Sequence, residues 1–238
     1  MPLDLEYTRK AAHRIAKFIR KNPKRADPDA IHHLRTGVRT MEIVLANRKV
    51  KPLVKQLTAI RKRAGKIRDM DVLTAKMLKL KREGEENCIV QLLELIGSKR
   101  DQSARKLHRS IEKLSPDLER KVRHAIKRVK RNSKQPRIPA SPPRPSRLSR
   151  NNLHRFRIRV KKVRDLLRLW GGSKNRKLVQ RLGTVKDSIG EWHDWTELLA
   201  LAKDSLDHGT RCNVLRQLKA ISESHYKKAL IQAKVFKT

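Results

Sequence analysis

A helical segment with two side-by-side stripes occurs twice in the chain, and this repeat constrains the fold more than any other feature. In residues 31–45 the apolar stripe follows helical spacing and consists of Leu34, Val38, Met41 and Leu45. The cationic stripe beside it consists of His32, Arg35 and Arg39. The segment 122 positions further on repeats both stripes, with Phe156, Val160, Val163 and Leu167 beside His154, Arg157 and Lys161. Such a repeat predicts two similar helical halves.

The segment that follows each striped helix also repeats, at an offset of 125 residues. The matched pairs are Gly65 with Gly190, Arg68 with His193, Asp69 with Asp194, and Arg61 with Lys186. On a helical wheel the four basic side chains lie close to the centre of the apolar face, where an unpaired charge is costly. Either the aspartates help to neutralise them or they line a groove that a ligand fills. For the aspartates, Asp71 included, we favour ion pairing over a catalytic role.

Periodic apolar positions predict eight helices and no strands. The helices are expected at 5–21, 28–47, 52–84, 86–114, 115–131, 153–170, 177–206 and 211–236. In the fourth helix the apolar positions include Val90 and Leu93. The fold class is therefore all-α, with four helices on each side of a break near Ser115, which divides the chain into 1–115 and 116–238. Residues 132–150 hold five of the ten prolines and are expected to form an extended, mobile linker.

The charge of the chain points to a polyanionic partner. Lys and Arg number 61 and Asp and Glu 23, so the net charge is +38. Nucleic acid, polyphosphate and an anionic membrane surface are the candidates. A charge stripe is usually only a solvated face, but its recurrence favours an anion site. Arg offers a planar fork of donors to phosphate oxygens and Lys a point charge.

Other classes of protein are disfavoured by what the sequence contains. No apolar run approaches the length of a membrane span and residues 1–4 do not begin a signal peptide, so we expect a soluble, cytoplasmic protein. Cys88 and Cys212 are expected as small buried residues. The histidines have no Cys or acidic cluster at ligand spacing, so we expect no metal and no cofactor. We also expect no enzyme, since there is no Gly-rich phosphate loop and no Glu-x-Glu-x-Lys element. Trp192 and Trp195 are interpreted as packing residues.

The two striped helices with their following segments resemble the CHAD family, the conserved histidine α-helical domain. The first signature consists of His32, Arg35, Arg39 and residues 68–72, and the second of His154, Arg157, Lys161, Lys162, Arg164 and residues 190–194. The resemblance implies two four-helix bundles of long helices, related by pseudo-twofold symmetry, around a basic central groove that binds inorganic polyphosphate. The chain is similar to a stand-alone member of this family, without a triphosphate-tunnel domain. Association with polyphosphate granules and the oligomeric state stay open.

Non-catalytic binding of inorganic polyphosphate is therefore the leading hypothesis. The expected binding residues are His32, Arg35, Arg39, Arg61, Arg68, His154, Arg157, Lys161, Lys162, Arg164 and Lys186. The first half has Thr40 and Glu42 where the second has Lys162 and Arg164, so we expect the second to bind more strongly. Two alternatives remain: nonspecific nucleic-acid binding, although aromatic residues are only 3%, and an enzyme that processes polyphosphate or a triphosphate.

Overall fold

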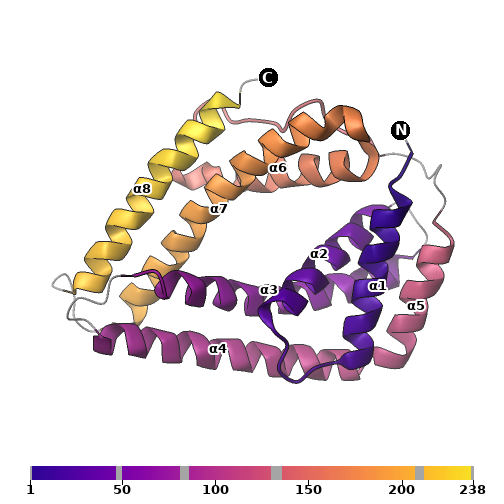
Figure 1. Cartoon of the computed structure of the whole chain (residues 1–238), viewed down its shortest axis with the longest axis horizontal. Helices are drawn as coiled ribbons and strands as arrows, with labels where there is room; N and C mark the ends of the chain where they lie inside the picture. The colour runs from indigo at the N-terminus through magenta and orange to yellow at the C-terminus, as the bar shows by residue number, and fades with distance from the viewer. Residues whose placement is uncertain (1, 47–49, 81–85, 130–135, 207–211, 237–238) are drawn as a thin grey trace. The chain divides into compact units, whose positions relative to one another are not determined.

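The computed structural model describes residues 2–46, 50–80, 86–129, 136–206 and 212–236. Within these ranges the chain is all-α, without a strand, which confirms the expected class. The described residues form eight α-helices: α1 (Leu5–Lys21), α2 (Pro28–Leu45), α3 (Lys51–Met77), α4 (Glu86–Glu112), α5 (Ser115–Lys127), α6 (Arg150–Trp170), α7 (Arg176–Ser205) and α8 (Asn213–Val235) (Figure 1). A short 3-10 helix, η1 (Ser173–Asn175), precedes α7.

Local signals in the sequence account for where the helices begin and end. The Asp27 carboxylate accepts a hydrogen bond from the backbone N–H of Ala30 at 2.7 Å, and Pro28 occupies the first turn, so α2 begins as expected. Asp4 caps α1 in the same way, through the backbone N–H of Tyr7 at 2.9 Å. The helix α1 ends at Lys21, and the C-cap residue Asn22 takes a left-handed conformation with φ of 34°.

The chain forms two compact units, each of which is described by itself. Unit 1 comprises Met1–Asp71 and Gly97–Gln135, and unit 2 comprises Val72–Ile96 and Pro136–Thr238. The long helices α3 and α4 contribute turns to both units, because Asp71 lies inside α3 and Gly97 inside α4. The expected break near Ser115 lies within unit 1, to which α5 belongs.

The core of unit 1 lies where α1 contacts α2 and α5. Ile15 and Ile19 of α1 and Leu34 and Val38 of α2 are at most 1% exposed, so the predicted apolar stripe of α2 faces inward. The two helices approach closely at Gly37: a Cβ atom there would lie 3.0 Å from the Ala11 carbonyl oxygen. Glycine thus lets α1 and α2 approach to a distance at which a Cβ atom would require a small local shift.

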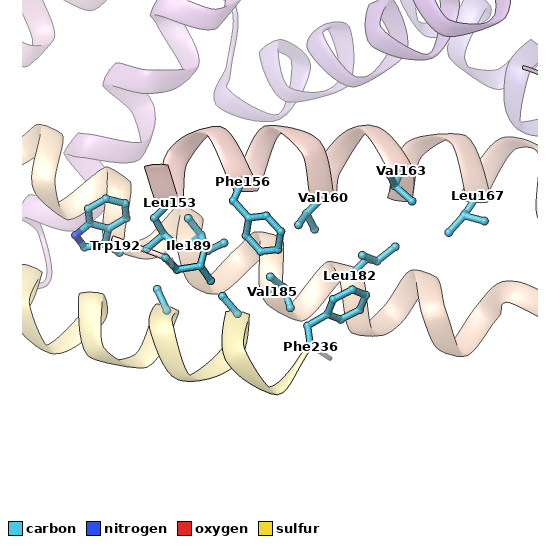
Figure 2. Packing of buried hydrophobic residues seen from close by; sticks show 13 residues of the cluster. Leu153, Phe156, Val160, Val163, Leu167, Leu182, Val185, Ile189, Trp192 and Phe236 are labelled. Carbon is cyan, nitrogen blue, oxygen red and sulfur yellow. The ribbon is translucent and has the colours of Figure 1, made fainter. Parts of the chain in front are cut away.

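The core of unit 2 lies between α6, α7 and α8 (Figure 2). Phe156, Val160, Val163 and Leu167 of α6 face Leu182, Val185, Ile189 and Trp192 of α7, and Phe236 closes one end. This confirms the second apolar stripe. Trp192 and Trp195 are each 5% exposed, as expected for packing residues.

The proline-rich segment has no helix or strand in its described part, residues 136–149. It differs from the expected free linker in that Ile138 and Leu148 pack against the core of unit 2. Pro142 is buried, and Nη1 of Arg159 donates a hydrogen bond to the Pro143 carbonyl at 3.2 Å. Residues 136–149 are therefore a packed part of unit 2, while residues 132–135 lie outside the described ranges.

Some bounds of the predicted helices and the buried side of one helix are wrong. The helix α5 ends at Lys127 rather than near residue 131, and α6 begins at Arg150 rather than at residue 153. The helix α3 ends at Met77 rather than near residue 84, and Leu78 just beyond it is 60% exposed; residues 81–85 lie outside the described ranges. At the start of α4 the buried side chains include Ile89 and Leu92, whereas Val90 is 51% exposed. Apolar residues occur on more than one face at the start of α4, so their spacing alone predicted the wrong buried face. Cys88 and Cys212 are buried free thiols, as expected.

Candidate anion-binding site

The basic residues of unit 2 lie where α6 packs on α7, and we call this set the α6–α7 face. It consists of His154, Arg157, Lys161 and Arg164 on α6 and Lys186 and His193 on α7. All six side chains are half-buried. On α7 they alternate with two glycines, in the order Gly183, Lys186, Gly190 and His193, at spacings that place all four on one side of a helix. Lys162, the remaining predicted residue, is exposed.

Arg157 lies directly against the backbone of α7 at Gly190. A Cβ atom at Gly190 would be 2.9 Å from Nη2, 3.2 Å from Nε and 3.3 Å from Cζ of Arg157. Two turns along α6, Arg164 approaches Gly183 in a similar way, with its Nε 3.5 Å from the corresponding Cβ position. The absent side chain at Gly190 thus makes room for the guanidinium group of Arg157, whereas Arg164 is at ordinary contact distance from a Cβ position at Gly183.

The Nε atoms of both arginines are buried without a hydrogen-bond partner among the described residues. A buried, unsatisfied donor is costly in a folded protein. Anion oxygens that approach these guanidinium groups would reduce that cost and form charge-assisted hydrogen bonds. This is the feature of the face that points most directly to an anionic ligand.

A pair of histidines adjoins Arg157. The ring centroids of His154 and His193 are 4.2 Å apart. The pKa of His193 is lowered from its ordinary value of 6.5 to about 4, mainly by burial and to a lesser extent by His154 and Arg157. Burial, with Arg157 second, also lowers the pKa of His154. Both imidazoles are therefore neutral near pH 7, where each offers one N–H donor.

Carboxylates partly balance the remaining cations of the face. Nζ of Lys186 lies 2.5 Å from Oδ1 of Asp187, the next residue in the chain. Nη1 of Arg164 lies 3.8 Å from Oδ1 of Asp165, a longer contact. Asp187 is 67% exposed, so this pair is open to solvent and weakly held.

In unit 1 the corresponding residues also lie together, between α2 and α3. Nε and Nη2 of Arg35 are each 3.9 Å from a Cβ position at Gly65, and Nη1 lies 3.8 Å from Oδ1 of Asp69. Burial lowers the pKa of His32, and the next causes are the charges of Arg68 and, more weakly, His33 and Arg35. His32, Arg35 and Arg68 are therefore neighbours, with Arg39 half-buried on α2.

Arg61, by contrast, is held by a carboxylate of its own. Its Nε donates a hydrogen bond to Oε2 of Glu42 at 2.7 Å, and the Thr58 hydroxyl donates to Oε1 of Glu42 at 2.5 Å. The Arg61 and Glu42 side chains are only 25% and 16% exposed. The aspartates of α3 were expected to pair with Arg61, so the partner was predicted wrongly. The sequence signal for the Arg61–Glu42 pair is that the first repeat has Glu42 and Thr58 where the second repeat has Arg164 and Gly183.

Two further charged residues, Asp71 in unit 1 and the buried Lys76 in unit 2, each have a partner of opposite charge. Asp71 accepts a hydrogen bond at 2.7 Å from Nε of Arg100, whose Nη2 donates to the Ala26 carbonyl, so this carboxylate has a structural role within unit 1. In unit 2, Nζ of Lys76 lies 2.6 Å from Oε2 of Glu191 and 4.6 Å from the centre of the Trp195 ring. Sequence reasoning missed Lys76, which carries no repeat signature.

The exposed basic helix α5 provides a contrast. Arg120 lies 2.8 Å from Asp117 and Arg123 lies 2.6 Å from Glu119, and Lys121 also pairs with Asp117. These cations have local carboxylate partners on the same helix and are well exposed. Among the described residues, no group of three or more His, Cys, Asp or Glu side chains could hold a metal ion.

The basic residues of both units lie within the part of the chain that matches a known family. Residues 9–203 match the CHAD domain. No curated protein and no solved structure matches the chain. In the described ranges, none of the helices has the length and apolar character needed to cross a membrane.

Proposed function

The chain belongs to the CHAD domain family, and on this premise we propose that it binds inorganic polyphosphate through the α6–α7 face, with a weaker contribution from the α2–α3 residues of unit 1. The observation that carries the proposal is the pair Arg157 and Arg164, whose guanidinium groups lie against α7 with buried Nε atoms that have no hydrogen-bond partner in the described part of the chain. CHAD domains are linked to polyphosphate, and these two side chains supply donors suited to phosphate oxygens.

The spacing of the two arginines favours a linear ligand. They are seven positions apart on α6, which corresponds to about 10 Å along a helix axis. A single phosphate ion reaches one of them, whereas a phosphate chain can reach both and then Lys161 between them. Affinity therefore increases with chain length and decreases with salt, as for other linear polyanions.

Unit 1 contributes less because Arg61 is held in a largely buried ion pair with Glu42, whereas the Lys186–Asp187 pair of unit 2 is open to solvent. Arg35, Arg68 and His32 remain close enough together to meet phosphate oxygens. Glu42, however, neutralises Arg61 and places a negative charge where unit 2 has Arg164. The stronger binding expected of the second half rests on this difference.

The proposed binding is not followed by hydrolysis. The carboxylates near the two faces contact cations: Asp187 contacts Lys186, Asp69 contacts Arg35 and Asp71 contacts Arg100. They thereby orient basic side chains instead of activating water. Phosphate release from polyphosphate that exceeds a heat-inactivated control, and that Asp69→Ala abolishes, would overturn this part of the proposal.

Nonspecific nucleic-acid binding is the competing function, favoured by the net charge of +38. The deciding experiment titrates the protein with long-chain polyphosphate, duplex DNA and orthophosphate at matched ionic strength, near 0.15 M salt. We expect polyphosphate to bind most tightly and orthophosphate most weakly. Equal or tighter binding of DNA would contradict the proposal.

A further inference from the structure

Gly190 differs from the other glycines whose surroundings involve a candidate binding residue. A methyl group at Gly190 would overlap Arg157, at 2.9 Å from Nη2. At Gly183 the nearest atom of Arg164 is 3.5 Å away, and at Gly65 the nearest atoms of Arg35 are 3.9 Å away, both of which are ordinary contacts. Only at Gly190, among these three, does the absence of a side chain decide where a guanidinium lies.

The location of Gly190 calls for a reason. It lies in the interior of α7, a helix of 30 residues, where glycine is among the least favourable residues. No turn is needed there, since α7 continues for several turns on both sides. Gly190 is buried and faces Arg157, so the space it leaves is filled by this guanidinium.

We infer that Gly190 is a positioning residue for anion binding: it seats Arg157 against α7 and so fixes where the donors of Arg157 meet a phosphate chain. The inference rests on the proposed function and adds a residue that carries no charge and need not touch the ligand. Arg157 is confined by Gly190 on α7 and lies close to the His154–His193 ring pair. A confined side chain loses less conformational freedom when the ligand binds.

A methyl group at this position should act on Arg157 and leave the fold intact. The overlapping atoms belong to the end of a flexible side chain, which can swing away without a shift of the α7 backbone. Alanine also favours a helix more than glycine does. Gly190→Ala should therefore keep or raise the unfolding temperature while it weakens binding. A purely structural role for Gly190 predicts the reverse: lower stability with unchanged binding.

The experiment compares Gly190→Ala with Gly183→Ala and Gly97→Ala, using long-chain polyphosphate as the probe. Gly97 lies in α4, and no described atom lies within 4 Å of a Cβ there, so this control isolates the gain in helix propensity. We expect Gly190→Ala to bind about three- to tenfold more weakly than wild type, since one charge-assisted contact is misplaced. The two controls should stay within about twofold of wild type, because ordinary contacts need no rearrangement. Wild-type affinity in a folded Gly190→Ala protein would overturn the inference.

A double-mutant cycle with Arg157→Ala separates positioning from other effects. Once the guanidinium is gone, Gly190→Ala has nothing to displace, so the double variant should bind like Arg157→Ala alone. Arg157→Ala should also lower the slope of log affinity against log salt by about one, as for one lost phosphate contact. A second, independent loss of affinity in the double variant would contradict the inference. So would a single Gly190→Ala protein that fails to fold beside a folded double variant, because the contact would then be structural.

The failure of the inference can be told from that of the proposed function. If wild type prefers polyphosphate and Arg157→Ala weakens binding, but Gly190→Ala does not, only the positioning role is wrong. If polyphosphate binding survives Arg157→Ala unchanged, the positioning role is again wrong, and other residues carry the function. If wild type binds DNA as tightly as polyphosphate, the proposed function fails and the inference fails with it.

Discussion

In unit 1, Oε2 of Glu42 accepts a hydrogen bond from Nε of Arg61 at 2.7 Å, and this pair replaces the two cations Arg164 and Lys186 of unit 2. A neighbouring position differs between the repeats as well. Thr58, which also donates to Glu42, occupies the position of Gly183, against which Arg164 lies. The two repeats therefore keep the same helical scaffold and differ at one turn, where unit 1 has a single largely buried ion pair and unit 2 has two cations whose carboxylate partners are only the next residues in the chain.

Removing the charge of Glu42 should strengthen polyphosphate binding. In Glu42→Gln the side-chain oxygen can still accept from Arg61, but the guanidinium is no longer neutralised. We expect about three- to tenfold tighter binding, with a stability loss of about 1–2 kcal/mol because a charge-assisted hydrogen bond becomes a neutral one. Titration with polyphosphate and denaturant unfolding measure the two effects.

The matched control for this change is Glu119→Gln on α5. Glu119 pairs with Arg123 at 2.6 Å, so this substitution also removes one negative charge from an ion pair with arginine. It does so on α5, which contributes none of the predicted binding residues. It should change the affinity much less. If both variants gain equally, only the total charge matters and the pair at Arg61 has no special role.

Loss of three cations from the α6–α7 face should weaken binding far more than loss of three from α5. Combining Arg157→Ala, Lys161→Ala and Arg164→Ala should cost about a hundredfold or more in polyphosphate affinity and reduce the salt slope by about two to three. The comparison set is Arg120→Ala, Arg123→Ala and Lys127→Ala, in which two of the three cations already have carboxylate partners.

Equal losses in the two triple variants would mean that the protein attracts polyanions through its overall charge. Circular dichroism should show unchanged helix content in both, since the buried stripe of α6 is untouched. The measurement is best made near physiological salt, where long-range attraction is screened and local contacts dominate.

Much of the fold could be predicted because its signals are local. Asp27 and Pro28 announce the start of α2, and the stripe from Phe156 to Leu167 shows which side of α6 is buried. The phase of α4 could not be read in this way, since Ile89 and Val90 are adjacent and both apolar, and only packing selects Ile89.

The candidate site was predictable as a set of charges but not as a geometry. The repeat identified Arg157 as the counterpart of Arg35 and Gly190 as the counterpart of Gly65. The contact between Arg157 and Gly190, however, depends on how far apart α6 and α7 lie. The Glu42–Arg61 pair likewise joins residues 19 positions apart on different helices. Distances of this kind arise from packing and are not encoded in the spacing of either helix alone.

Gly37→Ala should destabilise unit 1 without a direct effect on the binding residues. A methyl group would lie 3.0 Å from the Ala11 carbonyl oxygen and 3.2 Å from Cγ1 of Ile15, so α1 must shift. Overpacking typically costs about 1–3 kcal/mol, against which alanine gains about 1 kcal/mol of helix propensity. We expect a net loss of about 1–2 kcal/mol in denaturant unfolding, whereas Gly97→Ala should show the propensity gain alone. An equal gain in both variants would show that α1 adjusts at no cost.

Stability without ligand should fall as the pH is lowered from about 6.5 to about 4, because of His193. Its pKa is near 4 in the folded protein and near 6.5 when unfolded, so between these values the unfolded chain binds the extra proton. The stabilisation is complete above pH 6.5 and is lost as the pH approaches 4, by up to about 3 kcal/mol for the full shift. The charged and titratable groups around the ring are His154 and Arg157 on α6 and Glu197 on α7.

The affinity for polyphosphate should depend on pH in the direction opposite to that of the stability without ligand. An anion beside His193 favours the imidazolium, so polyphosphate should bind more tightly as the pH falls from 7 to 5 and should offset the loss of stability. In His193→Gln both effects should be reduced, whereas the exposed His13 on α1 serves as the control, with His13→Gln expected to change neither. Unfolding and titration at pH 5, 6 and 7, with and without polyphosphate, provide the comparison. An unchanged pH profile in His193→Gln would show that protons are taken up elsewhere and that the imidazole pair does not respond to the ligand.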